Sequence, residues 1–329
     1  MTEREVSRAA FLRDHGFAKA RIAALNEDAS FRRYFRLRGG PEPALLMDAP
    51  PDLEPVGPFI AIARHLIALG FSAPRILAAD AAAGWVLVED FGDSTFTRLL
   101  NTGHDEAPLY ELACDTLIAL ARQGHPIELA PYDTDTFVRE AGLLTEWHYP
   151  FKRGVSLSTG AGAAYLQAWR EVLGSLPHSA PTLVLRDYHV DNLMLLDGHE
   201  GVSRCGLLDF QDALLGPAAY DVASLVEDAR RDLPAALRER IVRRYEASLD
   251  SASRDAFRAW FPVLAAQRHA KVAGIFVRLF KRDGKAAYLR HIPRVVQMLE
   301  RHLDEPALAP VATWLAVHYP DFAQALPAP

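Results

Sequence analysis

Cysteine is scarce in this sequence, and long apolar runs are absent from it. Only two cysteines, Cys114 and Cys205, occur among 329 residues, far apart and in no spacing typical of metal ligands. This scarcity predicts a reducing compartment without a disulfide framework, with the cytoplasm as the default. No apolar run is long enough to span a bilayer, and the N-terminal stretch MTEREVSRAAFLRDHGF lacks the apolar core of a signal peptide. The twelve histidines show no zinc-binding spacing either.

An excess of positive charge is also missing. The 36 Lys and Arg residues stand against 42 Asp and Glu residues, which gives a net charge of -6. Such a chain has no general attraction to nucleic acid or to an anionic membrane, so we expect neither as a partner. Nothing in the sequence indicates an obligate protein partner. Half of the residues are apolar and 24% are charged, which is typical of a globular protein with a hydrophobic core.

The order of apolar patterns predicts an α+β fold with two lobes. Five short apolar runs predict strands, and one amphipathic segment with a glycine near its end predicts a helix among them, at residues 57–71. After EDFGD at residues 89–93 the patterns become long and helical, apart from short strand-like runs between residues 182 and 210. We therefore expect a small β-rich lobe over residues 1–92 and a larger, mainly helical lobe over residues 93–329. The five predicted strands lie at residues 21–25, 34–37, 44–47, 75–79 and 85–89.

A polar loop interrupts the apolar runs of the second lobe. In LVLRDYHVDNLMLL, Asp187 is followed five residues later by Asn192, and Asp209 ends the next apolar strand in GLLDFQD. Phosphoryl transfer uses such a set, because one carboxylate can accept the proton of the attacking hydroxyl while an amide oxygen and a second carboxylate hold Mg²⁺. Taken singly, Asp187 and Asn192 could equally belong to an ordinary turn. The spacing is that of the known kinase pattern.

The motifs LRDYHVDN and LLDFQDALLGPAAYD resemble those of the aminoglycoside phosphotransferase and choline kinase family. The resemblance implies a two-lobed fold similar to protein kinases, and ATP and Mg²⁺ as cofactors. Further blocks, DASFRRYFRL, LMDAPP, QRHAKVAGIF and RDGKAAYL, extend the similarity from about residue 26 to 290. They most resemble family members that phosphorylate C1 of N-acetylmuramate or N-acetylglucosamine in cell-wall recycling, which implies a small sugar as substrate.

The resemblance also implies a role for individual residues. Asp187 would be the catalytic base, while Asn192 and Asp209 would be the magnesium ligands. Asp221, in GPAAYD, would hold the catalytic loop through its backbone and is thus structural. Backbone groups around Glu89 and Phe91, in VLVEDFGD, would meet the adenine.

Several positions depart from the family pattern. No G-x-G-x-x-G loop precedes the second strand, so backbone around Ser30 and Phe31 would have to cover the phosphates. The strand position that usually carries a phosphate-binding lysine holds Met47. Arg32 or Arg33 is the nearest substitute, and because neighbouring strand residues point to opposite faces, only one of the two should reach the nucleotide.

Two further departures lie in the catalytic motifs. Leu185 replaces the histidine of the usual H-R-D, and Gln211 replaces the glycine of D-F-G. A regulatory pseudokinase is therefore an alternative, although retention of the base and of both metal ligands argues against it. A second alternative is an aminoglycoside or other small-molecule phosphotransferase. Aminoglycosides are polycations, whereas the loops here carry arginine and histidine beside their acids.

The sequence gives weaker signals for the residues that would contact the acceptor. The aromatic and acidic residues of EWHY are as typical of a core as of a sugar platform, and the polar residues of QRHAK fit a solvated helix face about as well as a binding site. His189, two positions after Asp187, could be an ordinary loop residue as well as a contact of the acceptor. The candidates for contact with the substrate are Glu146, Trp147, His189, Asp212, Arg268 and Lys271.

Overall fold

The computed structural model describes residues 2–25, 31–123 and 127–326. The chain forms two compact units, of which unit 1 comprises Met1–Thr116 and Val190–Ala213, and unit 2 comprises Leu117–His189 and Leu214–Pro329. The polar loop thus passes from unit 2 to unit 1 between His189 and Val190. This division runs differently from the lobe boundary expected at residue 92, which stays a prediction. No helix within the described ranges is long and apolar enough to cross a membrane.

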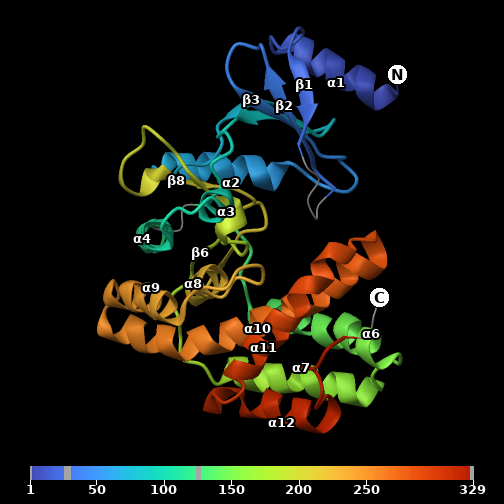
Figure 1. The fold of residues 1–329 in the computed structure, drawn as a ribbon, viewed down its shortest axis with the longest axis vertical. Helices are drawn as coiled ribbons and strands as arrows, with labels where there is room; N and C mark the ends of the chain where they lie inside the picture. Colours follow the sequence, from blue (N-terminus) through green and yellow to red (C-terminus); the bar gives the residue numbers. More distant parts are fainter. Residues whose placement is uncertain (1, 26–30, 124–126, 327–329) are drawn as a thin grey trace. The chain divides into compact units, whose positions relative to one another are not determined.

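Unit 1 is built on a five-stranded antiparallel sheet with the strand order β1-β2-β3-β5-β4 (Figure 1). All five predicted strands are present, and the predicted helix α2 (Gly57–Ala68) lies between β3 and β4 in the chain. The mixed fold expected from the sequence is therefore confirmed in this unit. The strands are β1 (Arg21–Ala24), β2 (Arg33–Arg38), β3 (Ala44–Asp48), β4 (Ile76–Asp80) and β5 (Trp85–Glu89).

One face of this sheet packs against the N-terminal helix α1 (Glu3–Asp14). The helix begins at a capping box, in which Thr2 and Glu5 each bond the other's backbone N–H. Its buried residues Phe11 and Leu12 form a core with alternate strand residues, because successive side chains of a strand point to opposite faces. The strand residues in this core are Leu37, Ala44, Leu46, Trp85 and Leu87.

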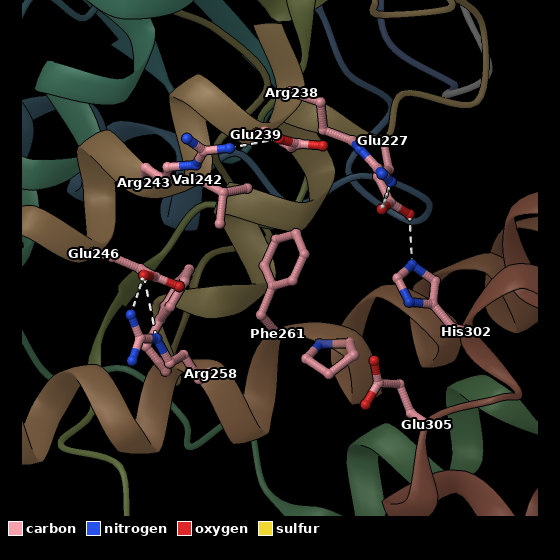
Figure 2. A pocket seen from close by; sticks show the side chains of 12 residues that line it. Glu227, Arg238, Glu239, Val242, Arg243, Glu246, Arg258, Phe261, His302 and Glu305 are labelled. Carbon is pink, nitrogen blue, oxygen red and sulfur yellow. Dashed lines mark hydrogen bonds and ion pairs between the residues drawn. The ribbon is translucent and has the colours of Figure 1, made fainter. Parts of the chain in front are cut away.

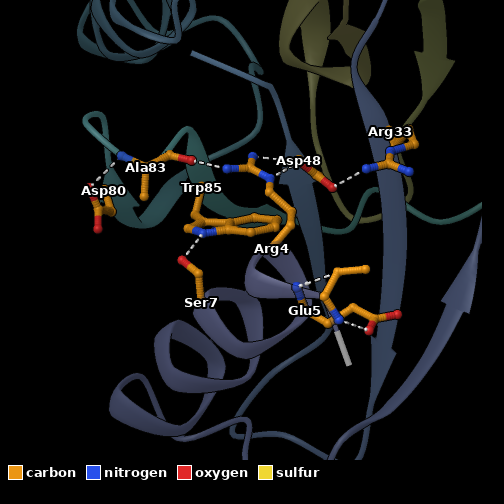
Figure 3. Close-up of polar contacts among 9 residues, drawn as sticks. Arg4, Glu5, Ser7, Arg33, Asp48, Asp80, Ala83 and Trp85 are labelled. Carbon is orange, nitrogen blue, oxygen red and sulfur yellow. Dashed lines mark hydrogen bonds and ion pairs between the residues drawn. The ribbon is translucent and has the colours of Figure 1, made fainter. Parts of the chain in front are cut away.

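The same face carries a polar cluster that ties α1 to the sheet (Figure 3). The guanidinium of Arg4 lies 3.8 Å from the ring centre of Trp85 and donates to Asp48. The indole nitrogen of Trp85 donates to Ser7 Oγ at 2.9 Å. Asp48 is fully buried and also accepts from Arg33, so β2, β3 and α1 meet at one carboxylate.

The remaining elements of unit 1 come from two distant parts of the chain. The helix α3 (Phe96–Asn101) follows the sheet, and α4 (Glu106–Ala121) begins in this unit. The second part contributes a hairpin of β7 (Leu193–Leu195) and β8 (Cys205–Leu207), preceded by a 3-10 turn, η2, at Val190–Asn192. Bridges from Thr95 to Met194 and from Ser72 to Gly206 attach this hairpin to the first part.

Unit 2 is mainly helical, with one two-stranded sheet of β6 (Thr182–Val184) and β9 (Leu214–Gly216). Its longest helix, α10 (Ser251–Asp283), begins at the Asp250 cap and ends at Gly284, which has a left-handed backbone. The other helices are α5 (Thr134–Ala141), α6 (Tyr149–Arg153), α7 (Thr159–Gly174), α8 (Ala219–Val226), α9 (Ala235–Ala247), α11 (Ile292–His302) and α12 (Ala309–His318).

A close approach inside unit 2 explains one glycine. A Cβ at Gly274 of α10 would come within 2.2 Å of the carbonyl oxygen of Leu143. Leu143 immediately precedes η1 (Leu144–His148), a π-helical turn, which is a rare element often found at functional sites. Any larger residue at position 274 would therefore push η1 away from α10.

Candidate functional site

Five of the residues predicted to bind nucleotide or metal line one cavity of unit 1. The cavity has a volume of about 340 Å³, within the range of small-molecule sites. Its walls combine apolar residues of the sheet, such as Leu45 and Val88, with the segment Glu89–Asp93 and the end of the second hairpin strand. The predicted residues on its walls are Arg32, Glu89, Phe91, Asn192 and Asp209.

Two arginines line this cavity: Arg36, which pairs with Asp90 and Asp93, and the more deeply buried Arg32. Only 9% of its side chain is exposed, and its Nε and Nη2 donate to Glu54 Oε2 at 3.1 and 2.9 Å. Its Nη1 lies 3.5 Å from Asp209 Oδ1. Glu54 also accepts from the backbone N–H of Phe31 at 3.2 Å, so one carboxylate fixes both the guanidinium and the backbone beside it.

Arg33 has a different environment. Its side chain is 49% exposed and pairs at 2.8 Å with Asp48 on the face that carries α1 (Figure 3). The two neighbouring arginines thus serve separate carboxylates, and only Arg32 lines the cavity. Met47 is fully buried, and Ser30 lies outside the described residues.

The two predicted metal ligands are neighbours in unit 1. Asn192 Nδ2 lies 3.4 Å from Asp209 Oδ2, and Gln211 donates to Asp209 Oδ1 at 2.8 Å. Asp209 has a φ of 56°, a left-handed conformation that costs a non-glycine residue energy and is often found where function requires it. A carboxylate and an amide at this separation fit a hard divalent cation such as Mg²⁺.

Asp187 lies in unit 2, at the end of a tight turn that follows β6. Its backbone N–H donates to the carbonyl of Leu185 at 2.9 Å, and Arg186 between them has a φ of 69°. Asp221 of α8 holds this turn by accepting from the N–H groups of Leu185 and Arg186 at 2.6 and 2.9 Å. Burial raises the pKa of Asp221 to about 7, against the lowering effect of those two bonds.

Cations of unit 2 surround Asp187. Burial alone would raise the pKa of Asp187, but the positive charges around it, with Lys271 the strongest and Arg268 beside it, outweigh burial and hold that pKa below its usual value. The side chain is therefore ionised across the physiological range. A general base must be unprotonated to accept a proton, and this environment provides that state.

The two substrate candidates on α10 are buried rather than solvated. Arg268 is 4% exposed and Lys271 is 8% exposed, which excludes a solvated helix face. Lys271 Nζ lies 3.1 Å from Glu140 Oε2 and donates to the hydroxyl of Tyr220 at 3.1 Å. Glu140 also pairs with Arg186 and accepts from the Tyr132 hydroxyl. Lys271 thus belongs to a buried network next to the catalytic loop.

The other four substrate candidates have different environments. Glu146 is exposed and lines a separate cleft of unit 2, of about 700 Å³, which contains no other predicted site residue. Trp147 is half-buried in η1, and Asp212 is exposed in unit 1, where it accepts from Gln211 at 3.4 Å. His189 is buried beside Arg230, whose Nη1 lies 3.4 Å from the Nε2 atom of the histidine.

A further cleft of unit 2 holds none of the predicted residues (Figure 2). At its edge, His269 and His302 both donate from Nε2 to one oxygen of Glu227, at 2.7 and 2.8 Å. Arg238 donates to the other oxygen at 3.0 Å. Burial alone would raise the pKa of Glu227, but the hydrogen bonds and charges of His269 and His302 hold it far below its usual value. Two histidines and a carboxylate can in principle bind a metal, but here hydrogen bonds and a neighbouring arginine occupy the carboxylate.

Sequence reasoning missed two acidic residues of the site. Glu54 lies in the loop PDLEPVG before α2, and Glu140 lies near the end of α5. Neither belongs to a motif, and an isolated glutamate is usually a solvated surface residue. The burial of Glu140 and the contacts of Glu54 with Arg32 become visible only in the folded chain.

Comparison with known proteins gives a family and a set of relatives. Residues 21–260 match the model of the phosphotransferase enzyme family. The chain is 36% identical to the N-acetylmuramate/N-acetylglucosamine kinase of Caulobacter vibrioides, over 97% of this chain and 98% of that one. It is 37% identical to the protein of the same name from Pseudomonas aeruginosa, over 90% and 88% of the two chains.

Solved structures show the same fold at low sequence identity. A choline/ethanolamine kinase family protein from Mesorhizobium loti matches with a TM-score of 0.65 at 15% identity, over 94% of this chain and 98% of that one. An ADP-bound aminoglycoside phosphotransferase matches with a TM-score of 0.60 at 13% identity, over 92% and 99%. The expected kinase-like fold is therefore confirmed.

Proposed function

The chain belongs to the phosphotransferase enzyme family, and from this premise we propose that it is an ATP-dependent kinase of the anomeric hydroxyl of N-acetylmuramate and N-acetylglucosamine. Four relatives with 34–37% identity over most of the chain carry the name of such a kinase, which supports this choice of acceptor. The role would lie in the recycling of cell-wall sugars in the cytoplasm. Phosphotransfer itself is supported best by one observation: Arg32, Asn192 and Asp209 line the same cavity.

The residues of unit 1 would bind the nucleotide. The apolar walls formed by Leu45, Val88 and Met194 suit the adenine, near the backbone of Glu89 and Phe91. Arg32, oriented by Glu54, would bind phosphate oxygens in place of the missing lysine of β3. Asn192 and Asp209 would hold the magnesium that accompanies ATP, and bound Mg²⁺–ATP supplies the phosphoryl group and neutralises part of its charge.

The residues of unit 2 would activate the acceptor. Asp187, ionised beside Lys271 and Arg268, would orient the C1 hydroxyl and accept its proton at a carboxylate oxygen. Asp221 would keep the turn of Asp187 in place through the two backbone N–H groups. The pattern retains a base and both metal ligands, which favours an active enzyme over a regulatory pseudokinase.

A panel of acceptors tests this function. ADP release would be measured with N-acetylmuramate, N-acetylglucosamine, choline and an aminoglycoside, and the product examined by phosphorus NMR. We expect turnover with the two N-acetyl sugars and a phosphate on C1. The methyl glycoside of N-acetylglucosamine, whose C1 hydroxyl is blocked, should be inert. Turnover of that glycoside, or of the aminoglycoside alone, would contradict the proposal.

A further inference from the structure

Three buried polar atoms near Asp187 have no hydrogen-bond partner within the part of the chain that the structure describes. They are Asp228 Oδ2, His189 Nδ1 and Arg268 Nε, on side chains that are only 3, 5 and 4% exposed. Native proteins leave few buried polar atoms unpaired, so a group of them calls for an explanation. The three come from separate parts of unit 2: the segment after α8, the catalytic loop and α10.

The three side chains belong to one electrostatic neighbourhood with the proposed base. The charge of Asp228 acts on His189, and so do the charges of Asp187 and Arg268. His189 follows Asp187 by two positions in the same loop. The neighbourhood reaches solvent, because Asp187 is half-buried and the side chain of Arg230 is 29% exposed.

The hydrogen-bond chemistry of the pair Asp228 and His189 is complementary. Arg230 Nη1 lies 3.4 Å from His189 Nε2, and because arginine only donates, Nε2 must be the accepting nitrogen. Burial, Arg230 and Arg268 lower the pKa of His189 more than Asp228 and Asp187 raise it, so the ring is neutral and its proton lies on Nδ1. The pair thus offers one donor, His189 Nδ1, and one acceptor, Asp228 Oδ2.

The backbone that carries Asp228 is held in place by its neighbours. Glu227 accepts hydrogen bonds from Arg238 of α9 and His302 of α11 (Figure 2). It also accepts one from His269 of α10. On the other side, the backbone N–H of Arg230 donates to Asp228 Oδ1 at 2.8 Å, which orients the carboxylate and engages only one of its oxygens. A binding group needs this kind of support to keep its geometry.

From these observations we propose that Asp228 and His189 form the acceptor subsite, where Asp228 Oδ2 accepts from, and His189 Nδ1 donates to, hydroxyl groups of the amino sugar other than the one on C1. A sugar hydroxyl both donates and accepts, so it satisfies both atoms. Arg268 adds a further donor from α10. The buried cations around Asp187 disfavour a polycationic acceptor. The inference rests on the proposed function, because it takes the acceptor to be an N-acetylated sugar.

Deoxy sugars test the subsite. Steady-state kinetics would be measured for the full chain with N-acetylglucosamine and with its 3-, 4- and 6-deoxy analogues. We expect the wild type to lose about 10- to 100-fold in kcat/KM with at least one analogue, the range for a lost bond to a charged group. Asp228→Ala should raise the KM for the parent sugar by a similar factor and leave the KM for ATP within about twofold.

The decisive measurement is whether removal of the Asp228 carboxylate and removal of the sugar hydroxyl have independent effects on kcat/KM. If Asp228 binds the hydroxyl that is missing from the sensitive analogue, Asp228→Ala should no longer distinguish that analogue from the parent sugar. A merely structural role would lower activity with all sugars alike. Asp228→Asn, of nearly the same shape, replaces the alanine variant if the latter does not fold, and should reduce the same discrimination. His189→Ala should lose discrimination in the same way.

Asp232→Asn is the matched control, because Asp232 lies on the same segment, is 80% exposed and pairs with Arg294. It should keep wild-type selectivity. Asp228 variants that still distinguish the analogues as the wild type does would overturn the subsite, as would a wild type indifferent to all three analogues. Failure of the wild type to phosphorylate either N-acetyl sugar would instead remove the proposed function, and the subsite with it.

Discussion

The two central aspartates of the proposed site, Asp187 and Asp209, occupy contrasting environments. Asp187 lies in unit 2 among the charges of Lys271 and Arg268, which hold its pKa down against burial. Asp209 lies in unit 1 with 39% of its side chain exposed, and the guanidinium of Arg32, which also pairs with Glu54, lies 3.5 Å away. The first carboxylate is surrounded by cations of the protein, whereas the second is partly exposed, as its proposed role as a metal ligand requires.

This contrast shows how one residue type can serve two chemical roles. A base that accepts a proton from a neutral hydroxyl benefits from fixed cations, which keep it ionised. A metal ligand must leave its oxygens accessible, because a hard cation takes several oxygen ligands at once. Neither role is encoded in the aspartate itself, and the following changes should affect the two residues differently.

The largest effect should follow from Asp187→Asn. This substitution keeps the shape of the side chain but removes the accepting charge, so kcat should fall by about 10² to 10⁴-fold while the KM for ATP changes little. Steady-state kinetics in both substrates measures this. Asp197→Asn, at an exposed position between β7 and β8, serves as the control. Near-wild-type kcat in Asp187→Asn would remove this residue from the mechanism.

The next largest effect should come from Asp209→Ala. Loss of a carboxylate ligand should abolish turnover or raise the magnesium concentration needed for half-maximal activity at least about 10-fold. Asn192→Ala should show a milder shift, because the amide is a neutral ligand. Magnesium titrations at fixed ATP measure both. Unchanged metal dependence in Asp209→Ala would mean that this loop is structural, and Asp187→Asn should leave the magnesium requirement unchanged.

The neighbouring arginines should respond unequally. Arg32→Ala should lower kcat/KM for ATP by about 10-fold or more, because it removes the buried cation of the cavity. Arg33→Ala, which removes the cation paired with Asp48 on the other face, should stay within about twofold.

Two further variants sharpen this comparison of the arginines. Arg32→Lys should restore only part of the activity, since lysine lacks the forked geometry. A double-mutant cycle with Glu54→Gln should be non-additive for Arg32. If neither Arg32→Ala nor Arg33→Ala changed kcat/KM for ATP, the cation that binds the phosphates would have to lie elsewhere in the protein.

The smallest effect concerns pH. Because Lys271 lowers the pKa of Asp187, Lys271→Met should let that pKa rise, and protonation of the base should then begin at a higher pH. The acidic limb of the kcat profile should move toward higher pH, while kcat at pH 8 changes less than about 10-fold. Lys281→Met, at an exposed position of the same helix, should leave the limb in place. An unmoved limb in Lys271→Met would show that the lysine does not act on the base.

Much of the fold could be predicted from local sequence. The five strands of unit 1 follow from short apolar runs between turn residues, and α10 follows from a long amphipathic pattern. The order of Asp187, Asn192 and Asp209 was readable too, because a catalytic loop is a short local motif. The division into compact units could not be predicted in this way, because it depends on where residues 190–213 pack.

What the sequence by itself determined is therefore the set of elements and the identity of the chemical groups. Only the tertiary structure decided which groups are paired: Arg32 meets Asp209 across 177 positions and Glu54 across 22, and Glu227 meets His302 across 75. The physical reason is that the burial and pairing of a charge depend on neighbours brought together by folding. A residue's own type and its sequence neighbours do not specify them.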